Sequence, residues 1–195
     1  GFALAWLAPK LRGTLWVTIV FNVWGWPFTA LVPVVAQQHL GLGAEGTGLL
    51  SSMDGAGAFL GAMALGLIAR PAHYARWYIA GVTLYLVFVI LFALAPASVP
   101  AGLALLASGA GQAGFAVMQA TLVYLAAPAE MRSRVLGLLT VCIGLGPIGF
   151  LHVGVLAELF GARLACIITG AEGLTALALT WRLWQPILAT EETRR

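Results

Sequence analysis

Six long apolar runs make up most of the chain, and short gaps between them hold most of the charged residues. A helix needs about 20 apolar residues to cross about 30 Å of hydrocarbon, and each run has that length. Glycine and proline, which end or reverse helices, mark the gaps. The pattern predicts six transmembrane helices at residues 14–36, 46–69, 77–95, 102–126, 135–160 and 162–184.

The composition indicates that the bilayer, not water, is the main solvent of this chain. Hydrophobic residues fill 61% of its 195 positions and charged residues 9%, whereas a soluble domain carries about 25% charged residues. So few polar side chains cannot cover so large an apolar surface in water. The net charge of +3 is not gathered into a basic block, so we expect no nucleic-acid partner.

The basic residues predict how the helices are oriented. Lys and Arg are retained in the cytoplasm more readily than they are translocated. Nine of the ten basic residues fall on one side of the predicted spans, and only Arg163 falls on the other. We therefore expect both termini in the cytoplasm and, from the excess of Arg, Ala and Gly, a bacterial inner (plasma) membrane. Residues 1–13 are predicted to form an amphipathic connector, or alternatively a disordered tail, and residues 185–195 a cytoplasmic tail.

Three ionisable side chains fall within the predicted spans, where a charge is costly unless it faces protein or water. Asp54 shares a helical face with small residues, which indicates close contact with another helix. Glu172 lies mid-span, and the imidazole of His152 follows a glycine-rich segment. We predict that Asp54 or Glu172 binds substrate or exchanges the coupling proton, with His152 as a further candidate. A structural hydrogen bond is the alternative for each.

Uncharged polar residues form stripes at helical spacing in the first and fourth spans. Such stripes line cavities or, alternatively, join helices by hydrogen bonds. The residues are Thr18, Asn22, Trp26 and Thr29 in the first span and Ser108, Gln112 and Gln119 in the fourth. We predict substrate contacts for Asn22, Trp26, Gln112 and Gln119.

Glycine and proline are concentrated in the fifth span at Gly146, Pro147 and Gly149. Proline removes a backbone donor and glycine permits close approach, so we predict a kinked, closely packed helix. No G-x-S-x-G run is present, and the three His and two Cys show no metal-ligand spacing. We expect neither enzymatic activity nor a metal or other cofactor.

The loop after the fourth span carries a specific motif, made of Pro128, Glu130, Arg132, Arg134, Val135 and Gly137. It resembles the P-x-E-x-R-x-R-V-x-G pattern of the major facilitator superfamily, in the branch that includes bacterial enterobactin exporters. The glycines and proline of the fifth span are similar to a motif of antiporters in that family. Residues 66–76 resemble the signature loop between the second and third helices, but Ala69 replaces the usual Asp.

The resemblance implies an all-α C-terminal six-helix bundle with three-plus-three inverted repeats, rocking against six further helices around a midplane site. Those helices would come from an N-terminal half or from a second copy of the chain. The implied activity is secondary active transport, with proton-coupled export of small amphipathic molecules such as drugs or siderophores. Ion pairs among Glu130, Arg132 and Arg134 would form a cytoplasmic gate. The alternative is a non-transporting membrane scaffold or sensor derived from a transporter half.

Overall fold

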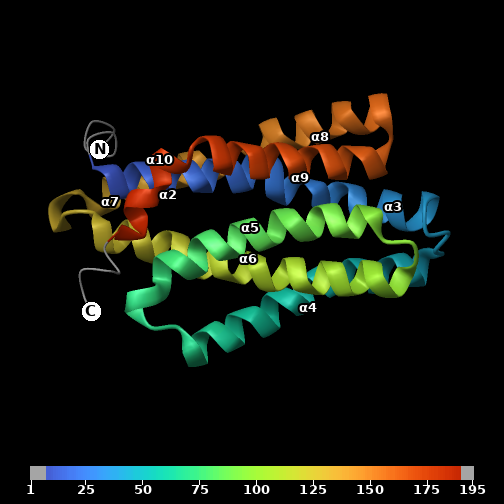
Figure 1. Cartoon of the computed structure of the whole chain (residues 1–195), viewed down its shortest axis with the longest axis horizontal. Coiled ribbons are helices and arrows are strands. Elements are labelled where there is room, and N and C mark those ends of the chain that lie inside the picture. The colour runs from blue at the N-terminus through green and yellow to red at the C-terminus, as the bar shows by residue number, and fades with distance from the viewer. Residues whose placement is uncertain (1–7, 190–195) are drawn as a thin grey trace.

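The computed structural model describes residues 8–189, and within that range it is built from helices without strands (Figure 1). Six helical stretches are long and apolar enough to cross a membrane. They are Pro9–Gln38, Ala44–Ile68, Pro71–Leu94, Ser98–Ala126, Ala129–Phe160 and Ala162–Leu179. The predicted all-α bundle of six transmembrane helices is therefore confirmed.

The helices differ from the predicted runs mainly at their ends. The first begins at Pro9, where proline is favoured at the start of a helix, and Leu11 is already fully buried. Residues 9–13, predicted as part of a connector, thus continue the first span, while residues 1–7 lie outside the described residues. The sixth ends at Leu179, not at 184, because Thr180 leaves the helical conformation. Residues 190–195 of the predicted tail also lie outside the described part.

Two of the six spans are interrupted near mid-length. The first comprises α2 (Pro9–Val20), η1 (Phe21–Gly25), η2 (Trp26–Leu31) and α3 (Val32–Gln38). The fifth comprises η4 (Ala129–Met131), α7 (Arg132–Ile143) and α8 (Gly146–Phe160). The other elements are α4 (Ala44–Ile68), η3 (Pro71–His73), α5 (Tyr74–Leu94), α6 (Ser98–Ala126), α9 (Ala162–Leu179), α10 (Trp181–Trp184) and η5 (Gln185–Ile187).

Helices α4, α5 and α6 pack with their backbones in contact. A Cβ at Gly57 would overlap the carbonyl of Leu106, and one at Gly81 would lie 2.5 Å from Gly111 O. Small residues permit such approach between helices in a membrane, where packing rather than water exclusion drives association. The glycines therefore make α4, α5 and α6 a close-packed group.

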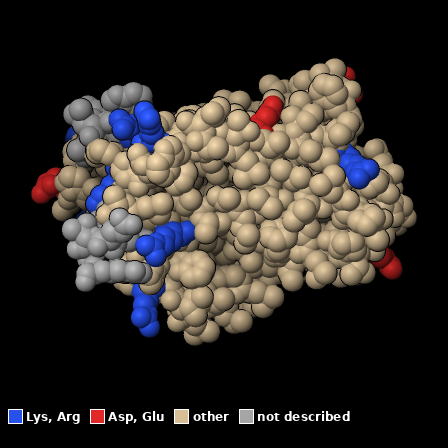
Figure 2. All heavy atoms as spheres, viewed as in Figure 1, with Lys and Arg blue, Asp and Glu red and all other residues tan. Residues whose placement is uncertain are grey.

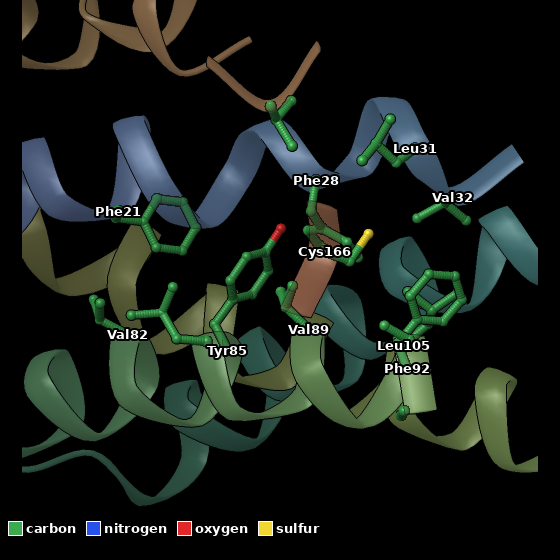
Figure 3. Close-up of a cluster of buried hydrophobic side chains, with 14 of the residues drawn as sticks. Phe21, Phe28, Leu31, Val32, Val82, Tyr85, Val89, Phe92, Leu105 and Cys166 are labelled. Carbon is green, nitrogen blue, oxygen red and sulfur yellow. The ribbon is translucent and has the colours of Figure 1, made fainter. Parts of the chain in front are cut away.

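Aromatic side chains join the first span to that group (Figure 3). The ring of Phe21 stacks on Phe115 of α6 at 3.8 Å between centroids, and it lies 4.8 Å from the ring of Tyr85 of α5. Phe28 meets Tyr85 edge-on at 5.5 Å. Phe28 and Tyr85 are fully buried, so the core lies between the first, third and fourth spans.

Charge is concentrated at one end of the bundle. Figure 2 shows most of the described Lys and Arg at the end where α2 begins and α6 ends, with a wide surface beyond it that is almost free of charged residues. A single basic patch lies near the opposite end in that view. The apolar sides match a bilayer, and the basic end matches a membrane–water boundary.

Candidate functional site

The helix of the first span is interrupted at mid-length. Pro27 has no N–H, and the N–H of Trp26 donates to Phe21 O, five residues back, in a π turn that is followed by a 3-10 turn. The carbonyl of Trp24 accepts a hydrogen bond of 3.1 Å from Thr169 Oγ1 of α9. Interruptions of this kind within a helix are frequent at functional sites.

The fifth span is interrupted as well, and the two interruptions meet. Helix α7 ends at Ile143 and α8 begins at Gly146, where the glycines and proline predict a bend. A Cβ at Gly149 would overlap Val23 O and lie 2.6 Å from Pro27 Cγ. Glycine at position 149 therefore lets α8 rest on the interrupted backbone of the first span.

Trp26 lies beside this contact. Its ring packs over Gly146, and it meets Phe150 of α8 edge-on at 5.2 Å between centroids. The Trp26 side chain is 39% exposed and Phe150 is half-buried. A partly exposed aromatic pair of this kind can contact an apolar or cationic ligand.

The side chain of Asp54, a residue of α4, contacts α6. It is ten positions beyond the start of α4, about 15 Å along the helix. Its Oδ1 accepts a hydrogen bond of 2.7 Å from Ser108 Oγ of α6. Among residues 8–189 no cationic side chain lies within ion-pair distance of this carboxylate. Ser108, which sequence analysis placed only in a polar stripe, is thus the direct partner of Asp54.

His152 and Glu172, treated as separate candidates in the sequence, form a pair. His152 Nε2 of α8 lies 2.6 Å from Glu172 Oε2 of α9, and the two side chains are 35% and 38% exposed. Glu172 is ten positions beyond the start of α9, as Asp54 is in α4, so both carboxylates lie at mid-bilayer depth. Only the fold brings the pair together, because the residues stand on different helices.

Thr18 and Asn22, the first two residues of the polar stripe in the first span, face the interior of the bundle. Asn22 is 4% exposed, and its amide donates to Thr18 O at 2.9 Å. Thr18 Oγ1 is 2.8 Å from Tyr78 OH of α5. In this conformation the Asn22 amide is buried and bonded within its own span, and its contact with substrate stays a prediction. Gln112 and Gln119 of α6 are half-buried.

In this conformation Arg132 of the predicted gate contacts Tyr124 and not Glu130. The guanidinium of Arg132 lies 4.1 Å from the ring centroid of Tyr124 and donates to Tyr124 O at 3.2 Å and to Tyr124 OH at 3.1 Å. Glu130 and Arg134 are exposed, and within the described range no ion pair joins Glu130 to either arginine. The open carbonyls at the end of α6 attract Arg132 instead.

Two cavities lie at opposite ends of the bundle. One of about 210 Å³ includes Lys10, Thr14 and Tyr74 in its lining, and one of about 360 Å³ includes Leu50, Met53 and Leu106. Neither is lined by Asp54, Trp26 or Glu172. The candidate residues therefore lie on helix faces, not inside these cavities.

Comparison with known proteins adds one finding to this geometry. A family model described as Major Facilitator Superfamily matches residues 14–194. That stretch takes in all six spans, from within the first to beyond the sixth. No curated protein matches the chain.

Proposed function

Because the chain belongs to the major facilitator superfamily of membrane transporters, we propose that it acts in secondary active transport. The proposed activity is proton-coupled export of small amphipathic molecules, such as drugs or siderophores, by alternating access. The substrate class and the direction rest on the resemblance of the loop around Glu130 and Arg132 to the branch of bacterial enterobactin exporters.

The observation that carries proton coupling is the environment of Asp54. Its carboxylate lies at mid-bilayer depth, and a neutral hydroxyl, that of Ser108, is the partner that holds it. A charge so placed without a cation is costly, and taking up a proton removes that cost. Asp54 is therefore the proposed proton acceptor, with Glu172 as a second candidate.

The contact between the two interrupted spans supports alternating access and an amphipathic substrate. Interrupted helices concentrate bending at defined points, here near Pro27 and between Ile143 and Gly146. The partly exposed rings of Trp26 and Phe150 lie beside these points. They offer a flat apolar surface whose π-faces also attract a positive charge.

We further propose that six more helices, from an N-terminal half or a second copy, face this bundle. Large apolar side chains are exposed along α4, α6 and α8, among them Phe59, Leu103 and Leu151. The basic end supports an inner-membrane location with both termini in the cytoplasm. In the opposite access state, Arg132 or Arg134 would pair with Glu130 as a gate.

The test is transport in proteoliposomes under an imposed pH gradient, with ethidium and a ferric catecholate siderophore as probes. We expect Asp54→Asn to lose gradient-driven movement and to retain exchange of the probe at equilibrium. Ser52→Ala is the matched control, because Ser52 is exposed on the same helix and its hydroxyl donates to Leu49 O. Undiminished gradient-driven movement in an Asp54→Asn, Glu172→Gln double variant would overturn the proposed coupling.

A further inference from the structure

Ser108 has one hydroxyl proton and two acceptors within reach. Its Oγ lies 2.7 Å from Asp54 Oδ1 and 2.8 Å from Leu105 O of its own helix. The Ser108 side chain is 0% exposed, so its surroundings in the protein must provide both contacts. The hydroxyl can donate a full-strength hydrogen bond to only one of the two acceptors at a time.

We propose that Ser108 is a positioning residue that lets Asp54 take up and release a proton while α4 and α6 stay in contact. The inference rests on the proposed function, in which Asp54 is the proton acceptor. It adds a second residue to that step and states which helices remain together during it.

Both protonation states can be written with every hydrogen bond satisfied. When Asp54 is charged, the Ser108 hydroxyl donates to the carboxylate. When a proton binds to Asp54, the new carboxyl O–H donates to Ser108 Oγ, and the Ser108 hydroxyl turns to Leu105 O. Ser108 keeps its own proton throughout, so the only net change is the proton gained by Asp54.

The backbone contact fixes the distance that this exchange needs. A Cβ at Gly109, next to Ser108, would overlap Asp54 O, and a Cβ at Gly57 would overlap Leu106 O. These two contacts lie one turn apart and hold the helices on both sides of the hydrogen bond. Closely packed segments of this kind have discrete arrangements and do not slide continuously.

Few charged groups surround Asp54, so the Ser108 hydroxyl is the main local influence on its protonation. Helix α4 packs against α6 and α3, and neither α6 nor α3 carries an acidic, basic or histidine residue. From α5, Tyr85 is a fully buried titratable residue near Asp54. On α4 itself Glu45 is nine positions away, about 13 Å along the helix.

The test follows the protonation of Asp54 directly, without a substrate. Infrared spectra of the protein in lipid nanodiscs are recorded as the pH is lowered, and the carboxylic acid carbonyl band missing from Asp54→Asn is assigned to Asp54. In Ser108→Ala we expect the pH of half-appearance to rise by about one to two units, because a hydrogen bond donated to a carboxylate favours its charged form. Ser108→Thr, which keeps a hydroxyl, should restore the original midpoint, and Ser52→Ala should not change it.

A second measurement tests whether the helices stay together. Spin labels at Leu60 on α4 and Val117 on α6, both exposed, should give the same distance above and below the Asp54 midpoint. A change in that distance, an unchanged midpoint in Ser108→Ala, or an Asp54 that never binds a proton would each overturn the inference. If the midpoint shifts as expected but Asp54→Asn transports normally, only the proposed function fails.

Discussion

Gly149 of α8 lies directly against the carbonyl oxygen of Val23 in η1, with no room for a Cβ between them. Each residue belongs to an interrupted helix, and Pro27 is the residue that removes a donor near Val23. The contact therefore joins the first and fifth spans close to the places where their helices are interrupted. Its energetic importance can be measured, because α8 also has a glycine in open surroundings, Gly154.

Gly149→Ala is expected to destabilise the protein. The added methyl group would push α8 away from Val23 O and Pro27, at an overpacking cost of about 1–3 kcal/mol. For a chain of this size, that cost lowers the melting temperature by about 2–12 °C. The measurement is thermal unfolding in detergent followed by size-exclusion chromatography. Gly154→Ala on the same helix is the control, since nothing lies within 4 Å of a Cβ there, and equal effects of the two variants would contradict the proposed contact.

Gly57→Ala should disrupt the pairing of α4 with α6, because its Cβ would overlap Leu106 O. Backbone atoms cannot move aside as a flexible side chain does, so we expect a loss at least as large as that of Gly149→Ala. Gly55→Ala, two positions away and open, should be neutral or stabilising by up to about 1 kcal/mol from helix propensity. Thermal unfolding of the two variants side by side gives the answer, and a stable Gly57→Ala protein would mean that α4 and α6 are less tightly packed.

Local patterns of the sequence predict the helices. They do not predict contacts between side chains on different helices, because long-range packing sets those contacts. Apolar runs of membrane length identify all six spans, because each run meets the bilayer requirement by itself. The partner of Glu172 is not predictable in this way, since His152 stands on another helix and only their packing sets the distance. Pro27 signals a break in the first span, which we did not predict, while the ligand contact of Trp26 stays a prediction. Asn22 fits a polar stripe equally well whether it faces a cavity or the interior.

Glu130→Gln is expected to leave thermal stability unchanged within about 0.5 kcal/mol. The side chain is exposed and makes no ion pair with Arg132 or Arg134 in the described conformation. If Glu130 forms its pair only in the opposite access state, the same variant should change the transport rate in proteoliposomes. Tyr124→Leu is the complementary change, because it frees Arg132 from the ring and hydroxyl that hold it. A stability loss in Glu130→Gln would show that Glu130 already has a structural partner.

The contact of His152 with Glu172 should appear as coupling in a double-mutant cycle. Single replacement by Ala leaves the other polar group without its partner at mid-bilayer depth, which is costly. The double variant His152→Ala, Glu172→Ala removes both groups and avoids that cost. We therefore expect the double variant to be more stable than the sum of the single effects predicts, by about 0.5–3 kcal/mol.

The size of this coupling separates two roles for the pair. Hydrogen bonds between membrane helices average about 0.6 kcal/mol in measured cycles, so a value near that figure indicates ordinary attachment of α8 to α9. A larger value indicates that the bilayer or a facing helix isolates the pair from water, since its side chains are more than one-third exposed in this six-helix unit alone. Reversible unfolding in mixed micelles measures the coupling, and pairing His39 with Glu172 in a second cycle supplies the control. Zero coupling in the first cycle would mean that the 2.6 Å contact contributes nothing to stability.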